Sequence, residues 1–178
     1  MRTDRLVTAT VSAALERIKA QISQNIDTLG LRASGKTQAS MHVEQTDHGG
    51  ILWGRTYFQG LEKGSAPAQR GAWFRAVIKQ WIIDKGLTID TRSYKTPEAA
   101  LDSAAYLISR AIMRNGTVTF QQGGRKDVYT PAITDGVAEL RKSLAVEVKR
   151  TIVEGRSVGG NYFAVKRQKD NNVWQTKV

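Results

Sequence analysis

The chain has 178 residues but no cysteine, only two histidines, and no hydrophobic run of the roughly 18 residues that would span a bilayer. Without cysteine it can form no disulfide, thiol nucleophile or cysteine–zinc site. His42 and His48 have no nucleophile signature near them, which disfavours histidine-rich metal sites and most histidine-based catalysis. The first residues also lack the apolar block of a signal peptide. We therefore expect a protein of a reducing compartment that has no membrane partner.

What the sequence contains in excess is positive charge. Lys and Arg number 27 against 16 Asp and Glu, which gives a formal net charge of +11. About half of this surplus lies beyond residue 140. Such an excess favours polyanionic partners or charge-complementary assemblies. With 40% hydrophobic and 24% charged residues, the chain otherwise has the composition of a packed globular protein, and its length predicts one domain.

Apolar residues recur at helical spacing in four stretches, and each stretch has a start or stop signal. The first two stretches stop at Gly30 and Gly86, where a left-handed C-cap belongs. Thr96 and Thr130 each precede a proline, which is the combination expected at the start of a helix. We expect the last of these four helices to end at Gly155.

Between these helices, the sequence predicts a small sheet. Strands over residues 37–46 and 51–53, joined by a glycine turn, would form a hairpin, and a further short strand is expected at 117–120. The order of elements predicts an α+β fold, with long amphipathic helices packed on a small, mostly antiparallel sheet. We assign residues 1–155 to this single domain and residues 156–178 to an extended basic C-terminal arm.

One motif resembles a nucleotide-binding loop. Gly30, Gly35, Lys36 and Thr37 match the pattern G-x-x-x-x-G-K-[ST], in which backbone amides hold phosphates and the Thr hydroxyl holds magnesium. A P-loop lies between a buried strand and a helix, whereas here a long helix is predicted before the motif and a strand after it. We therefore interpret the match as accidental, a helix C-cap followed by a turn, and predict no cofactor.

No other pattern predicts catalysis. Asp135 and Glu139 fall opposite the apolar stripe of the last helix, where they are expected to be solvated partners of basic residues. The sequence contains no recognisable triad or metal-ligand cluster, so we predict that the chain is not an enzyme. The aromatic residues at helical spacing or beside turns are predicted to belong to the core: Phe74, Trp81, Trp53, Tyr57 and Phe58.

The chain resembles the neck proteins of tailed bacteriophages, which join head to tail or complete the tail, in the segments 33–43, 50–54, 57–64, 104–117 and 127–133. The shared patterns include an aromatic-x-x-x-Glu-x-Gly turn with Glu62 and Gly64, and an Ile-x-x-x-Gly-Thr helix end with Gly116 and Thr117. The segment 127–133 matches the one that opens the last helix of the family. The likeness extends over about residues 1–155.

The resemblance implies a structural virion protein that is assembled in the host cytoplasm. It would form a homo-oligomeric ring in the neck, between the DNA-filled head and the tail. Its partners would be further copies of itself and the portal, adaptor or tail proteins, with weak non-specific contact to DNA. No catalytic residue or cofactor comes with the family. The alternative that the charge leaves open is a basic protein that binds nucleic acid without sequence preference.

For such a ring, the last helix and the C-terminal arm form the predicted subunit interface. The apolar stripe that should face the core comprises Ile133, Val137, Leu140, Leu144, Val148 and Ile152, and Val146 and Val153 fall on nearly the opposite side. The predicted interface residues are Val146, Lys149, Arg150, Val153, Val158, Tyr162, Phe163, Val165 and Trp174. The residues that could face DNA are Arg141, Lys142, Lys166, Arg167 and Lys169. The alternative is a disordered arm and a helix buried only within its own subunit.

Overall fold

The computed structural model describes residues 2–46, 49–158, 166–167 and 174–175. The long helices are α1 (Arg2–Thr28), α4 (Trp73–Lys85), α5 (Pro97–Asn115) and α7 (Thr130–Val158). Short helical segments connect them: α2 (Lys36–Ala39), η1 (Thr56–Gln59), α3 (Gly60–Lys63) and α6 (Val118–Gln121). The strands form two antiparallel pairs, β1 (His42–Thr46) with β2 (Gly49–Trp53) and β3 (Lys166–Arg167) with β4 (Trp174–Gln175). The predicted α+β class is confirmed.

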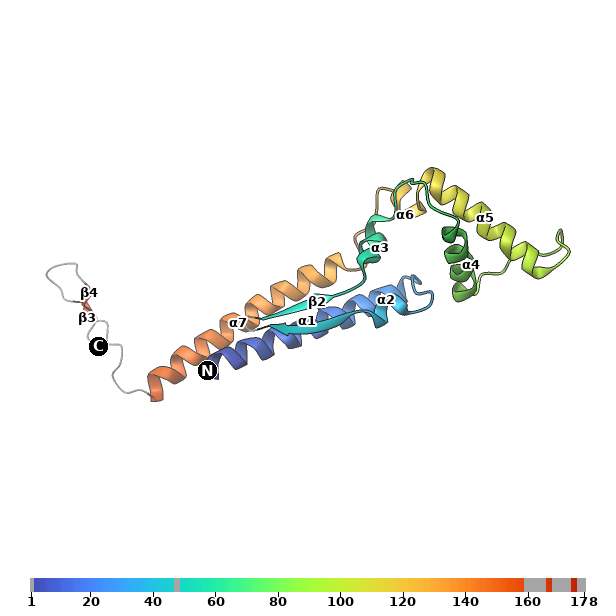
Figure 1. Cartoon of the computed structure of the whole chain (residues 1–178). Coiled ribbons are helices and arrows are strands. Elements are labelled where there is room, and N and C mark those ends of the chain that lie inside the picture. Colours follow the sequence, from blue (N-terminus) through green and yellow to red (C-terminus); the bar gives the residue numbers. More distant parts are fainter. Residues whose placement is uncertain (1, 47–48, 159–165, 168–173, 176–178) are drawn as a thin grey trace.

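One half of the molecule consists of α1, the hairpin β1–β2 and α7, which we call the body. Figure 1 shows α1 and α7 side by side in opposite directions, with the hairpin along α1. The hairpin register places Val43 opposite Leu52 and Gln45 opposite Gly50. Gly50 allows the close approach to α1, because a Cβ at this position would lie only 2.8 Å from the Leu15 Cδ1 atom.

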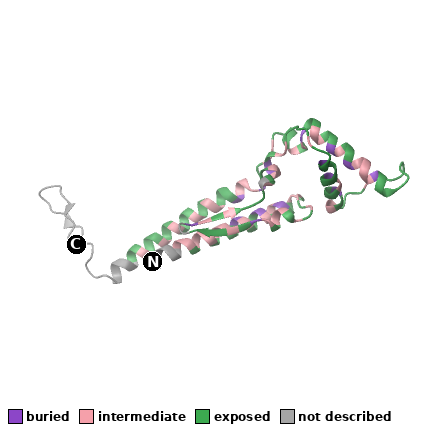
Figure 2. Ribbon diagram, viewed as in Figure 1, coloured by how far each residue is buried: buried purple, intermediate pink, exposed green. Residues whose placement is uncertain are grey.

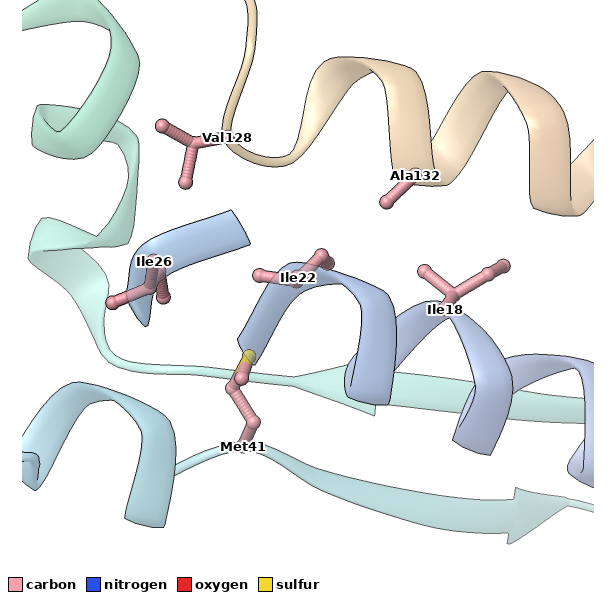
Figure 3. Close-up of a cluster of buried hydrophobic side chains, with 6 residues drawn as sticks. All are labelled: Ile18, Ile22, Ile26, Met41, Val128 and Ala132. Atoms are coloured by element: carbon pink, nitrogen blue, oxygen red, sulfur yellow. The ribbon is translucent and has the colours of Figure 1, made fainter. Parts of the chain in front are cut away.

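The core of the body forms where its three elements meet. Ile18, Ile22 and Ile26 follow one another on successive turns of α1 and are buried. They pack against Met41, just before β1, and against Val128 and Ala132 at the start of α7 (Figure 3). The body is therefore a three-layer arrangement in which each apolar face of α1 has a covering element.

The helices α4 and α5 form a separate lobe, which lies beyond the end of the α1–α7 pair in Figure 1. Its small core comprises Phe74, Ile78, Ile82 and Ala105, with partly buried neighbours on α5. The Lys85 ammonium donates to the Gly30 carbonyl and so connects the end of α4 to the end of α1. The body and the α4–α5 lobe thus have separate hydrophobic cores within the range that the sequence analysis assigns to one domain.

Most helix boundaries follow the predicted signals. Gly30 and Gly86 adopt left-handed conformations, with φ of 62° and 63°. After α1, the Leu31 N–H donates to the Ile26 carbonyl at 2.9 Å and the Gly30 N–H to the Asp27 carbonyl at 3.0 Å, which is the Schellman pattern. At the start of α5, the Thr96 hydroxyl accepts from the Ala99 N–H at 3.2 Å. These predictions are confirmed.

Three predicted boundaries are wrong. The strand expected over 37–46 begins only at His42, because residues 36–39 form the single turn α2. The strand expected at 117–120 is the helical turn α6, which the Thr117 hydroxyl caps by accepting from the Phe120 N–H. Helix α7 continues through Gly155 to Val158. A glycine costs a helix interior only about 1 kcal/mol, which does not force the helix to end.

The predicted core face of α7 is also wrong in part. Ala132 is buried against α1, whereas Ile133, Val148 and Ile152 are exposed. Gly136 explains this difference, because a Cβ there would collide with the Ile18 side chain. Helix α7 therefore faces α1 with small residues, and one side of its predicted apolar stripe points away from α1.

The predictions for the aromatic residues are also right in part and wrong in part. Phe74 is buried and Phe58 is partly buried against the body core, as expected. Trp53, Tyr57 and Trp81 are exposed, so their assignment to the core is wrong. Figure 2 shows exposed residues over much of α4, α5 and the C-terminal half of α7. Within the described part of the chain, no helix is long and apolar enough to cross a membrane.

Candidate functional site

One buried carboxylate, that of Glu62, joins α3 to the segment 128–130 at the start of α7. Glu62 Oε1 accepts the backbone N–H groups of Val128 at 2.9 Å, Tyr129 at 2.7 Å and Thr130 at 2.9 Å. Glu62 Oε2 accepts the Thr130 hydroxyl at 2.5 Å. The carboxylate therefore satisfies the N–H groups that precede and begin α7, where a helix has no internal acceptors. Its negative charge also complements the positive end of the helix dipole.

Two opposing effects act on the pKa of Glu62. Burial raises the pKa, because it removes water from the charged form. The hydrogen bonds from the Thr130 hydroxyl and from the N–H groups of Thr130, Tyr129 and Val128 stabilise that form and together outweigh burial, so the net pKa is lowered. Glu62 is thus held ionised, with both oxygens occupied by donors. This arrangement suits a structural role and leaves no free general base.

Two close-packed glycines join the turn after Glu62 to the end of α5. Gly64 has φ 70°, and a Cβ there would collide with the Phe120 backbone nitrogen. Gly116 has φ 78°, and its Cβ would lie 2.7 Å from the Ser65 carbonyl oxygen. In the space that they leave, Ser65 donates its N–H to Thr117 Oγ1 at 2.9 Å and accepts the Thr117 N–H at 2.9 Å.

Further contacts connect this region to η1, to α1 and to the segment before α7. The rings of Phe58 and Tyr129 lie 5.4 Å apart in a tilted arrangement. Asn25 of α1 donates its side-chain amide to the Val128 carbonyl at 2.7 Å. The Arg125 N–H donates to the Glu62 carbonyl at 2.8 Å. We call Glu62, Gly64, Gly116, Thr117 and the segment 128–130 the junction.

The P-loop-like segment has a different environment from a phosphate site. Helix α1 precedes the motif, where a P-loop requires a strand. The segment after Gly35 is the helical turn α2, so the strand predicted there is wrong. The Arg32 guanidinium packs against Gly35, within 3.3 Å of a Cβ built there. In the described residues, no group of three or more His, Asp or Glu side chains is placed to hold a metal ion.

The predicted interface residues on α7 lie on its outer surface. Val146 and Val153 are 63% and 65% exposed. Lys142, Val146, Lys149 and Val153 recur at helical spacing and therefore share one face. Arg150 is exposed and lies 3.5 Å from the Glu147 carboxylate. Arg141 is exposed as well, on another side of the helix.

The remaining predicted interface and DNA-facing residues lie in the C-terminal arm. Lys166 and Arg167 form β3, and Trp174 is part of β4. Val158 is the last residue of α7. The structure describes only the backbone element of these four residues. The predictions for Tyr162, Phe163, Val165 and Lys169 lie outside the described residues.

Individual sequence motifs did not reveal the junction. Its donors lie 66 to 68 residues away from Glu62, a separation that local periodicity cannot bridge. A signal was nevertheless present, because Glu62, Gly64, Gly116, Thr117 and the segment 127–133 all belong to the patterns on which the predicted resemblance to the phage neck proteins rests. The structure brings these patterns into contact at one place. No family model, curated protein or solved structure matches the chain in comparisons with known proteins.

Proposed function

We propose that this chain is a structural protein of a tailed-phage virion and forms a ring in the neck that joins the DNA-filled head to the tail. The observation that carries the proposal is the junction. Three segments that resemble the neck family only as separate short patterns meet there through the Glu62 carboxylate and through the close approach of Gly64 to Thr117 and of Gly116 to Ser65. Short patterns that match by chance have no reason to be neighbours in the fold.

The distribution of exposed apolar side chains also supports an assembling protein. Large apolar residues are exposed on the outer surface of α7, on the hairpin and on the α4–α5 lobe. Monomeric proteins seldom leave large contiguous apolar surfaces in water, and such surfaces commonly mark interfaces. A subunit that becomes enclosed by its neighbours in a ring accounts for them.

The charge is consistent with weak contact to DNA passing through the ring. Arg141, Lys142 and Lys149 are exposed along α7, and the whole chain carries a net charge of +11. Contacts of this kind give affinity that falls steeply with salt and is independent of sequence. The same charge supports the second candidate, a basic protein whose main activity is to bind nucleic acid.

The test is to purify the full-length chain and examine it by negative-stain imaging and native mass spectrometry. We expect closed rings of a single copy number, and duplex DNA should bind them only at low salt. If the chain remains monomeric at every concentration and binds duplex DNA tightly at physiological salt, the nucleic-acid-binding candidate replaces the neck protein. Fractionated phage particles that contain the chain at their necks would support virion localisation.

A further inference from the structure

The α4–α5 lobe carries an apolar stripe that its own core does not use. Trp73, Val77 and Trp81 follow one another at intervals of one helical turn and are 61%, 50% and 39% exposed. The core of the lobe occupies the neighbouring face of α4. Tryptophan is among the residues that most often dominate the binding energy of interfaces. The stripe therefore has the composition of a contact surface.

The body contains a groove with complementary properties. It lies between α1 and α7 and has a volume of about 640 Å³. Small side chains line much of it, among them Ala9, Ala13 and Ala14 of α1 and Ser143 of α7, whereas Ala132 and Gly136 are already packed against Ile18. The charged residues that line the groove are Asp127, Asp135 and Glu139, together with Arg17 of α1, so acidic groups outnumber basic ones there. A surface of small residues on two helices can receive large side chains from a third helix, as knobs enter holes.

The charges along the two surfaces have matching order. The stripe follows Arg70 and ends at Asp84, so its charge changes from positive to negative along the chain. On α7, Asp135 and Glu139 come first, and Lys142 and Lys149 follow on the same face. When α4 runs parallel to α7, opposite charges therefore meet at both ends.

We propose that the stripe of one copy docks into the groove of the next, with Trp73 and Trp81 between α1 and α7 of the neighbour. The inference rests on the proposed ring and names the surface that builds it. Within one molecule α4 lies beyond the end of the α1–α7 pair, so the contact joins different copies (Figure 1). Because the two surfaces differ, each copy offers one of each, and repetition of this head-to-tail contact builds a ring when the rotation between copies closes.

Because the chain has no cysteine, engineered disulfides can test the contact cleanly. The full-length chain with Val77→Cys and Ala13→Cys should form a ladder of linked copies on a non-reducing gel, up to the size of the ring. The matched control combines Ala13→Cys with Ile83→Cys, which lies on another side of α4 and is 53% exposed. This control should remain almost entirely unlinked.

A second measurement compares association of point variants by native mass spectrometry. Val77→Glu should raise the concentration needed for half-assembly about tenfold or more, because it places a charge in the centre of the contact. Ile83→Glu should change it little. Asp135→Lys should weaken assembly, and adding Arg70→Glu in the same chain should restore part of the loss.

The outcomes separate this inference from the proposed function. Two results together would overturn the docking and leave the proposed ring intact. The Val77→Cys, Ala13→Cys variant would form rings without a disulfide, and Val77→Glu and Ile83→Glu would weaken assembly equally. Links that stop at dimers would overturn the head-to-tail geometry. A chain that stays monomeric and unlinked at all concentrations would overturn both the docking and the proposed ring.

Discussion

The body and the α4–α5 lobe each pair two helices along a row of isoleucines, but only in the body does a third element, the hairpin, pack on the first helix. In the body, the hairpin packs on α1, and Glu62 secures the start of α7. In the lobe, Ile78 and Ile82 face α5, while Trp73 and Trp81 remain in solvent. Two helices can bury only one face of each other, so a further apolar face needs another element. The chain supplies that element in the body, and we propose that a second copy supplies it in the lobe.

The largest expected effects come from one substitution made in both regions. Ile22 in the body and Ile82 in the lobe are both 1% exposed, and replacing either with Ala should cost about 3 kcal/mol. Ile22→Ala should lower the free energy of unfolding of the whole protein. Ile82→Ala should open mainly the lobe. Hydrogen exchange of the α1 and α4 amides distinguishes the two results, and equal loss of protection in both helices with Ile82→Ala would contradict separate cores.

Loss of the charge at the junction should have the next largest effect. Glu62→Gln keeps the shape of the side chain but weakens its bonds to the N–H groups at the start of α7, at a cost of about 2 kcal/mol. Denaturant unfolding at pH 7 measures this. Glu98→Gln is the control, since Glu98 belongs to an exposed ion pair with Lys79 in the lobe and should matter less. A stronger effect of Glu98→Gln would argue against the junction as the key contact.

The same carboxylate gives the stability a pH dependence of known sign. The pKa of Glu62 is lowered in the folded protein, so its contribution is present above the ordinary glutamate pKa of about 4.3. That contribution should decline as the pH falls from this value to the lowered folded pKa, because in this range the unfolded chain binds a proton that the folded protein does not. Below the folded pKa both states are protonated, and the contribution is lost. Glu62→Gln should flatten this part of the acid unfolding curve. An unchanged curve would contradict the prediction.

A smaller and purely local effect is expected at the cap of α5. Thr96→Ala removes the acceptor of the Ala99 N–H and should cost about 1 kcal/mol. The loss should appear as faster exchange in the lobe, with no change in α1 or α7. Thr96→Ser keeps the hydroxyl and is the matched control. Equal exchange in the two variants would show that the cap contributes nothing.

The smallest expected effect concerns the P-loop-like segment of the body. The loop before Lys36 follows helix α1. A phosphate-binding loop of this type requires a strand at that place. Calorimetric titration with ATP or GTP should therefore detect no binding, and Lys36→Ala should change nothing. Micromolar binding that Lys36→Ala abolishes would contradict this interpretation of the motif.

Local signals predicted the elements of both regions better than their packing. Gly30, Gly86 and the Thr96–Pro97 start act within a few residues, so periodicity and capping rules found these ends. The face that α7 presents to α1 depends on Gly136 meeting Ile18, which is a contact between distant segments. The same holds for Glu62 and its donors. Trp81 was misassigned because helical spacing does not tell whether a second face has a partner.

Hydrogen exchange at several protein concentrations tests most directly whether the body is complete in one copy and the lobe is not. In a dilute monomer, amides of α1 and α7 around the body core should already be protected, while those of α4 and α5 exchange much faster. As the concentration rises into the range of assembly, protection should increase in α4 and along the α1–α7 groove. If α4 and α5 are as well protected as the body in the monomer, and unchanged on assembly, the contrast between the two regions is wrong.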